Sequence, residues 1–267
     1  MGNTQVKLIP KEIREADFPI ARFLSEEEQA RYEDSIKQFT GKAYDSLNVP
    51  IEGSNLFKVL WLNQIGIPTA NLYQLEQVIE NDRDFLRGHY EDIPSVVLRS
   101  NGDSYKPNDY LAKSLAEVIK ERDFKHSLIL NGLELKADEN SHYGLILVPG
   151  EKFKRIEAPD FDYENNKRRF SRLDEKGLPI FSEEGNKTFY ASKNGLCRLS
   201  LNDYLYLNSD NGPLVNSGSH GRVVFINSEG AEKNLEEYIS KLRQEKEKQK
   251  LDIDERYNRA MNVLIGN

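Results

Sequence analysis

Apolar residues in the first third of the chain recur at helical spacing. Tyr32, Ile36 and Phe39 lie three and four positions apart, so in a helix they share one face. Ser25 and Glu28, just before this stripe, have the spacing of a capping box, in which each residue satisfies a free amide at the helix start. The pattern predicts a helix that begins directly after Ser25.

A pair of helices is predicted next. Apolar stripes run through residues 56–65 and 72–79, and Gly66 and Pro68 interrupt the helical pattern between them. Two helices joined by a short turn with a glycine also have the spacing of a helix-turn-helix motif. Together the stripes predict a helical N-terminal region over residues 1–92.

The periodicity changes after Pro94. Short runs rich in β-branched and aromatic residues indicate strands between residues 93 and 228, and one further helix is expected after Asn108. Asn131 and Gly132 stand between two alternating runs, which predicts a β-hairpin with a type I′ turn. We therefore expect an α+β fold, with helices packed on one face of a mixed or antiparallel sheet.

Two segments depart from this pattern. Residues 159–187 are dense in charges of both signs and their apolar residues are isolated, which predicts a charged surface insertion in the sheet region. Residues 229–267 carry two apolar stripes separated by the wholly polar segment 243–250, which predicts one long C-terminal helix that docks at one or both ends. A projecting amphipathic end would offer a surface to a protein partner, and we expect the partner there.

Composition narrows the function classes. The 267 residues include 44 acidic and 37 basic side chains, and the net charge of −7 disfavours nucleic acid and anionic lipid as partners. No apolar run approaches the roughly 20 residues of a membrane span, and the first residues lack the apolar core of a secretory signal. With Cys197 as the one cysteine, no intramolecular disulfide can form. We expect a soluble, cytoplasmic protein with no membrane partner.

The glycine-rich segment 216–226, NSGSHGRVVFI, holds the first candidate residues. A phosphate-binding loop needs a helix start directly after it, whereas strand-forming residues follow here. We interpret the segment as a tight turn into a core strand. His220 and Arg222 are candidate catalytic residues if this turn lines a pocket.

An acidic cluster suggests a metal site. Asp160, Asp162 and Glu164 alternate along the chain, so in an extended segment their carboxylates share a face. Hard oxygen ligands of this kind bind Mg²⁺ or Ca²⁺. A metal-dependent hydrolase or nuclease would use these acids, with His220 as a further ligand and Arg222 to stabilise charge.

Basic residues near position 170 suggest single-stranded nucleic acid as a second possibility. Four of them surround Phe170, and basic side chains with an interleaved aromatic can follow a single strand. They are Lys167, Arg168, Arg169 and Arg172. Acidic residues are frequent in the flanking sequence and cancel most of this charge.

Three residues of the predicted second helix would face DNA in a helix-turn-helix protein. Asn71, Tyr73 and Gln74 are of types that can contact base edges. Residues 52–80 contain one lysine, no arginine and three glutamates, which leaves few contacts to phosphate.

The first hypothesis from the sequence is a non-enzymatic protein-interaction protein, because no strong catalytic spacing is present. The alternatives are a metal-dependent hydrolase or nuclease and a weak helix-turn-helix DNA binder. The sequence leaves the cofactor open, between none and Mg²⁺ or Ca²⁺ if the acidic cluster is a site.

Overall fold

The computed structural model describes residues 20–50, 53–82, 84–99, 105–120, 125–162, 167–174, 176–191, 195–202, 204, 206–209 and 212–227. The chain divides into two compact units. One is Ala21–Ile226, and the other combines Met1–Ile20 with Asn227–Asn267 and lies almost entirely outside the described residues. The long helix predicted for residues 229–267 also lies outside them.

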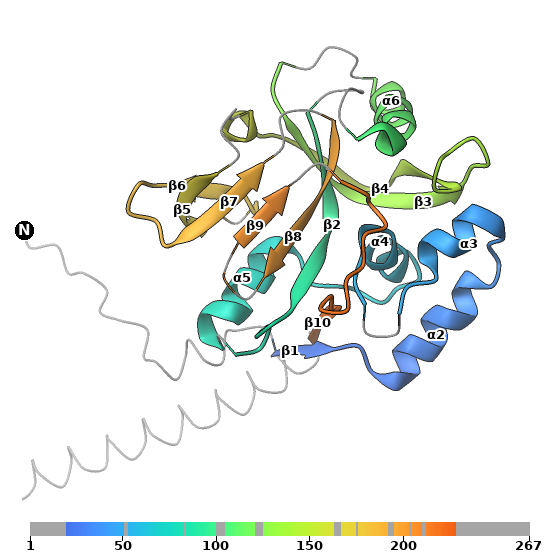
Figure 1. Cartoon of the computed structure of the whole chain (residues 1–267), viewed down its shortest axis with the longest axis horizontal. Coiled ribbons are helices and arrows are strands. Elements are labelled where there is room, and N and C mark those ends of the chain that lie inside the picture. The colour runs from blue at the N-terminus through green and yellow to red at the C-terminus, as the bar shows by residue number, and fades with distance from the viewer. Residues whose placement is uncertain are drawn as a thin grey trace, which may run out of the picture. The chain divides into compact units, whose positions relative to one another are not determined.

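Within the described residues the chain forms five α-helices, two short 3₁₀ helices and ten strands (Figure 1). The helices are α2 (Glu26–Ile36), α3 (Gly41–Leu47), α4 (Leu56–Gln64), α5 (Leu72–Asn81), α6 (Asp109–Val118), η1 (Lys106–Asn108) and η2 (Pro159–Phe161). The strands are β1 (Ile20–Phe23), β2 (Tyr90–Leu98), β3 (Leu128–Ala137), β4 (Leu145–Glu157), β5 (Arg168–Leu173), β6 (Pro179–Phe181), β7 (Lys187–Ala191), β8 (Leu196–Asn202), β9 (Tyr206–Ser209) and β10 (Val224–Asn227). The protein belongs to the α+β class.

Eight strands form one mixed sheet in the order β4-β3-β2-β8-β9-β7-β5-β6. All neighbours in it are antiparallel except β7 and β9, which are parallel. Strands β1 and β10 form a separate two-stranded sheet. The expectation of a mixed or antiparallel sheet is confirmed.

Both faces of the central strands are buried. Along β2, Val96 and Leu98 belong to one hydrophobic cluster, with residues of α2, α3, α4 and α6, whereas Val97 belongs to a second, with residues of α5. Successive strand residues point to opposite faces, so helices cover the sheet on both sides. The prediction of helices on one face was therefore wrong. The continuous apolar run at the end of β2 is typical of a strand buried on both faces.

The local signal at the start of α2 is confirmed. Ser25 and Glu28 form the predicted capping box at the start of α2: the Glu28 amide donates to Ser25 Oγ at 3.3 Å, and the Ser25 amide donates to Glu28 Oε2 at 3.0 Å. Such caps depend on neighbouring residues alone, which is why they can be read from sequence.

The predicted hairpin at Asn131 and Gly132 is not present. Strand β3 runs straight through both residues, and its pairing with β4 jumps from Asn131↔Lys154 to Leu133↔Pro149. Gly132 has a φ of +67°, and a Cβ there would lie 2.4 Å from the Lys152 carbonyl oxygen. The Asn-Gly pair marks a bulge inside a long strand pair. The same sequence signal fits both structures, because a glycine bulge and a type I′ turn each place a residue at positive φ.

The described part of residues 159–187 also differs from the expected surface insertion. It contains η2, β5, β6 and the first residue of β7. Phe161, Phe170 and Leu173 are buried in the second hydrophobic cluster. Phe161 belongs to η2, whereas Phe170 and Leu173 lie three positions apart in β5, whose pairing with β6 shifts register between Phe170 and Arg172.

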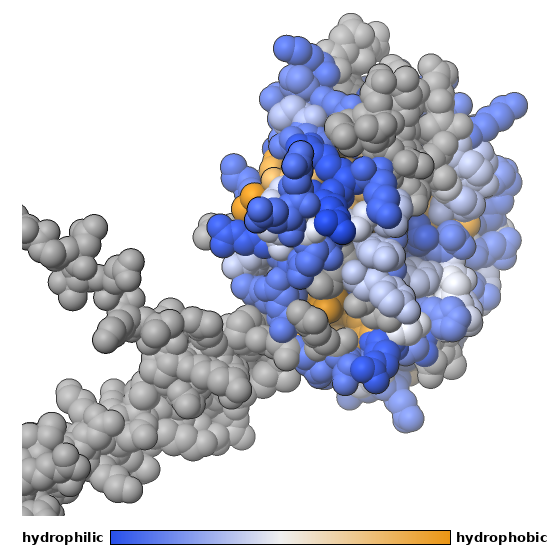
Figure 2. All heavy atoms as spheres, turned by 60° about the vertical axis from the view of Figure 1, so that its left-hand side comes forward, coloured by the Kyte–Doolittle hydropathy of each residue, from blue (hydrophilic) through white to orange (hydrophobic). Residues whose placement is uncertain are grey.

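The outer surface matches the high charged fraction. The face drawn in Figure 2 is mostly hydrophilic, with apolar residues visible only in small patches. None of the described helices is long and apolar enough to cross a membrane.

Candidate functional site

The glycine-rich segment 216–222 wraps around Tyr90, the first residue of β2. The Tyr90 amide donates to the His220 carbonyl oxygen at 3.0 Å, and the Arg222 amide donates to the Tyr90 carbonyl oxygen at 2.9 Å. The Gly218 amide donates to the Tyr90 hydroxyl oxygen at 2.7 Å. The segment is therefore hydrogen-bonded to the amide, the carbonyl and the hydroxyl group of Tyr90 before the chain enters β10.

The second glycine of this segment is required by close packing. A Cβ on Gly221 would lie 2.7 Å from the Ser54 backbone nitrogen and 3.1 Å from the Tyr90 hydroxyl oxygen. Real Cβ atoms do not approach backbone this closely, so only glycine fits. The strand β10 follows, in keeping with the interpretation of a turn into a core strand.

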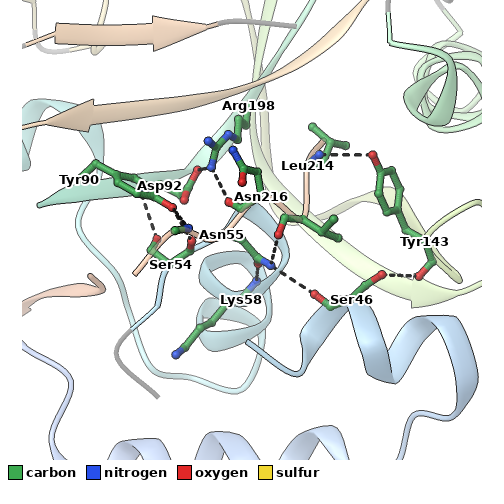
Figure 3. Close-up of polar contacts among 12 residues, drawn as sticks. Ser46, Ser54, Asn55, Lys58, Tyr90, Asp92, Tyr143, Arg198, Leu214 and Asn216 are labelled. Atoms are coloured by element: carbon green, nitrogen blue, oxygen red, sulfur yellow. Dashed lines mark hydrogen bonds and ion pairs between the residues drawn. The ribbon is translucent and has the colours of Figure 1, made fainter. Parts of the chain in front are cut away.

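Arg198 of β8 lies at a polar pocket of about 370 Å³ beside Tyr90. Its Nη1 donates to Asp92 Oδ1 at 2.7 Å and to the Asn216 carbonyl oxygen at 2.9 Å (Figure 3). Its guanidinium lies 5.7 Å from the centre of the Tyr90 ring. His89, His220 and Tyr204 line the same pocket, together with a serine and three asparagines.

Two buried carboxylates lie next to pocket residues but do not line the pocket themselves. Glu91 and Asp92 are both 0% exposed, and Asp92 Oδ2 and both carboxylate oxygens of Glu91 have no hydrogen-bond partner among the described residues. Burial raises the pKa of Asp92 to about 6, although Arg198 and Ser54 act in the opposite direction. Burial also raises the pKa of Glu91 well above its usual value, and the charge of Asp92 adds to this.

Two groups oppose the rise in the pKa of Glu91. One is the Val224 amide, which faces the carboxylate outside ordinary hydrogen-bond geometry, and the other is the charge of Lys58. Lys58 on α4 is itself 0% exposed, and its Nζ lies 3.3 Å from Gln29 Oε1. Burial lowers the pKa of Lys58 to about 8. Neither Lys58 nor Glu91 lines the polar pocket. Their charges lie on α4 and β2, and Gln29 of α2 contacts the lysine, so these groups belong to the interior of the fold and not to the pocket.

His220 and Arg222, the two catalytic candidates, do not face the same hollow. His220 lines the polar pocket at Arg198. The Arg222 side chain donates to the Ser219 and Gly221 carbonyl oxygens and lines a different hollow, beside Phe23.

The acidic candidates have local partners. Asp160 pairs with Arg168 at 3.1 Å. Asp162 accepts hydrogen bonds from the Ser127 amide and hydroxyl, each at 2.6 Å, and contacts His126 Nδ1 at 2.7 Å. Although burial acts to raise the pKa of Asp162, these hydrogen bonds hold it below its usual value. Glu164 lies outside the described residues, and within the described ones no three His, Cys, Asp or Glu side chains are placed to hold a metal ion.

The acidic segment and the glycine-rich segment lie at opposite ends of β2. Arg99, directly after β2, donates from Nε to the Phe161 carbonyl oxygen, whereas Tyr90 at the other end contacts His220. A strand rises about 3.3 Å per residue, so the ends of this strand are roughly 26 Å apart. The structure does not bring Asp160 and Asp162 together with His220.

The residues proposed to contact DNA begin α5. The Asn71 amide donates to Gln74 Oε1 at 3.0 Å, and the Gln74 amide donates to Asn71 Oδ1 at 2.9 Å. This reciprocal capping box uses the polar groups that would otherwise contact bases. Asn71 and Tyr73 line a separate cavity of about 660 Å³.

The basic candidates near Phe170 lie in or beside β5. Phe170 is 0% exposed, so its ring is not available to stack on a base. Lys167 Nζ lies 6.0 Å from the centre of the Tyr190 ring, and the Arg168 guanidinium lies 3.7 Å from that of Phe181. Arg169 and Arg172 are exposed on the same strand.

No protein-family model, curated protein or solved structure matches this chain.

Sequence reasoning identified His220 but missed Arg198 and Tyr90, which line the same pocket, and Asp92, which holds Arg198. A signal was present in the sequence LCRLSL, where Arg198 falls on a strand between buried leucines. An arginine in such a position needs a carboxylate partner, because an unpaired buried charge is costly. The sequence does not show which carboxylate supplies it.

Proposed function

We propose that this chain is a non-enzymatic interaction protein that binds an acidic segment of a partner protein at the Arg198 pocket. The observation that carries the proposal is the fixed orientation of Arg198. Its Nη1 is held by Asp92 and Asn216, whereas Nε and Nη2 make no hydrogen bond to any described residue. A guanidinium held on one side in this way can bind a carboxylate with its remaining donors.

The rest of the pocket supports binding of a peptide. Asn202, Asn208 and Asn216 provide amide groups that can both donate and accept hydrogen bonds. Tyr204 is 68% exposed, and its ring stacks on Tyr206 with 5.7 Å between centres. Exposed aromatic residues beside an arginine are frequent anchors in protein interfaces.

The alternatives receive less support from the geometry. A metal-dependent hydrolase built from Asp160, Asp162 and His220 would need these residues to meet, and they lie at opposite ends of β2. The contact expected through residues 229–267 remains a prediction, since that segment lies outside the described residues.

The proposal can be tested by NMR titration of the ¹⁵N-labelled chain with the acetylated, amidated peptide Gly-Gly-Glu-Gly-Gly. We expect shifts at the amides of residues 88–90, 198–202 and 216–220, and no such shifts with the glutamine version of the peptide. Arg198→Gln should abolish the shifts. Arg172→Gln, on the exposed face of β5, should leave them unchanged.

Because Arg198→Gln leaves Asp92 without its cation, the double variant Arg198→Gln/Asp92→Asn serves as a second test that removes both charges. Shifts that persist in a folded double variant, or that are equal for the glutamine peptide, would show that the proposal is wrong.

A further inference from the structure

A second cavity, of about 660 Å³, lies where β2 and β3 separate. The two strands pair only from Ser95↔Asn131 to Leu98↔Leu128. Pro94, Ser95 and Asn131 line the cavity at the point of separation. The strands part there because β2 continues toward Tyr90 while β3 follows β4 through the bulge at Gly132.

A side chain from α4 replaces β2 along the free edge of β3. The Leu135 amide donates to Gln64 Oε1 at 2.9 Å, and Gln64 Nε2 donates to the Leu135 carbonyl oxygen at 3.3 Å. This contact satisfies both backbone groups of Leu135, and neither Gln64 nor Leu135 is among the residues that line the cavity.

Much of the cavity wall is apolar. Ile129, Ile156 and Leu199 contribute from the sheet, and Leu72 and Tyr73 contribute from the start of α5. Tyr73 is half-buried and lines the cavity. A wall of this kind favours a ligand with a flat aromatic or apolar body.

The charged residues among the described lining are all lysines. Lys152 and Lys154 come from β4, and Lys176 comes from the turn between β5 and β6. No ion pair to a described carboxylate engages any of the three. In a chain with a net charge of −7, the described lining of this cavity carries basic and no acidic side chains.

A hydrogen-bonded polar pair also lines the cavity. The Ser95 hydroxyl donates to Asn131 Oδ1, and both residues line the cavity. This bond fixes the Asn131 amide and leaves its Nδ2 without a hydrogen-bond partner among the described residues.

We infer that this cavity binds a phosphorylated small molecule with an aromatic or apolar body, such as a nucleoside diphosphate. The three lysines would neutralise the phosphate charge, since lysine is a common phosphate ligand in proteins. The apolar wall and Tyr73 would hold the body. The volume lies within the roughly 300–1,000 Å³ of ordinary ligand pockets. This site is separate from the Arg198 pocket and does not depend on the function proposed for it.

Isothermal titration of the full chain with ADP tests the inference, with adenosine and inorganic phosphate as partial ligands. We expect ADP to bind at least tenfold more tightly than either. The double variant Lys152→Gln/Lys154→Gln should weaken ADP binding at least tenfold. The matched control Lys113→Gln/Lys136→Gln, which removes two exposed lysines away from the cavity, should change it less than twofold. Raising the salt from 50 to 500 mM should weaken binding of ADP but not of adenosine.

Three results would overturn the inference. They are the absence of ADP binding at millimolar concentration, equal affinity for ADP and adenosine, and an equal loss in the control variant. If a twelve-residue oligothymidylate binds through Lys152 and Lys154 while ADP does not, the lysines form a nucleic-acid surface and the small-molecule site is wrong. All four lysines are exposed, so we expect unchanged thermal unfolding midpoints, which can be measured alongside.

Discussion

The guanidinium of Arg198 lies 2.7 Å from Asp92, a carboxylate with no exposed surface. The two residues belong to neighbouring strands, β8 and β2, whose pairing shifts register between Asp92 and Val96. The ion pair therefore spans the irregular part of the sheet. It fixes the arginine in the lining of the polar pocket and gives the buried acid its one charged partner among the described hydrogen bonds.

Replacing Asp92 with asparagine is expected to stabilise the fold at high pH. The folded-state pKa of about 6 lies above the ordinary value of 3.8, so the folded state holds this proton more tightly than the unfolded state. The stability that this group contributes is complete below about pH 4 and is lost as the pH rises through 6. A two-unit difference corresponds to about 3 kcal/mol. Asp92→Asn, which resembles the protonated acid, should raise the free energy of unfolding at pH 8 by up to this amount, and change it little at pH 4.

Urea denaturation at a series of pH values measures this difference. Asp45→Asn, at an exposed position of α3, is the matched control and should show no such trend. A lower stability of Asp92→Asn than of the natural chain at pH 8 would contradict the account of the buried acid.

Lys187 is expected to be essential to the packing of α5 on the sheet. Its Nζ contacts Glu76 and lies 2.5 Å from Glu80 Oε1, and the Glu76 carboxylate also accepts from the Leu173 amide at 2.8 Å. Lys187→Met leaves Glu76 buried without its cation and should cost about 3–5 kcal/mol of stability. The double variant Lys187→Met/Glu76→Gln should recover most of that loss, whereas Lys136→Met, at an exposed lysine, should have little effect. Chemical denaturation provides the comparison, and equal losses for the single and double variants would argue against a charge effect.

Gly132→Ala is expected to disrupt the bulge between β3 and β4. The positive φ is unfavourable for alanine, and the new Cβ would meet the Lys152 carbonyl oxygen. We expect a loss of about 2 kcal/mol or more in unfolding free energy. Gly212→Ala is the control, because its Cβ would have no neighbour within 4 Å and its φ is not positive. If the two variants unfold at the same temperature, the strain assigned to Gly132 is absent.

The contact between Gln64 and Leu135 is expected to protect one backbone amide from exchange. Gln64→Ala removes the acceptor of the Leu135 amide, so hydrogen exchange at Leu135 should accelerate, with a stability loss of about 1 kcal/mol. Gln38→Ala, which removes an exposed side chain from another part of the fold, should not change that exchange rate. An unaltered rate in Gln64→Ala would indicate that another group covers this edge.

The sequence predicted the features that depend on near neighbours. The capping box of Ser25 and Glu28 and the short strands expected between residues 93 and 228 follow from local patterns. The structure confirms the box and has strands in that range, such as β7 and β8. The Asn131–Gly132 pair shows the limit, because the backbone conformation is local but the choice between turn and bulge depends on β4.

The candidate site was harder to predict because its parts are far apart in the chain. Tyr90, Arg198 and Asn216 meet only through the pairing of β2 with β8 and the path of the glycine-rich segment. Both relationships are tertiary, and no spacing along the chain encodes them. His220 could be identified because its glycine-rich surroundings are themselves a local signal.

The pairing of β1 with β10 has a consequence for engineering (Figure 1). The first and last described strands are neighbours, so a short linker could join them while new ends are opened in the exposed turn at residues 139–140. Such a circular permutant of residues 21–226 would retain every strand pair of the eight-stranded sheet. The same adjacency would let this unit be inserted into a surface loop of a host protein without stretching either chain.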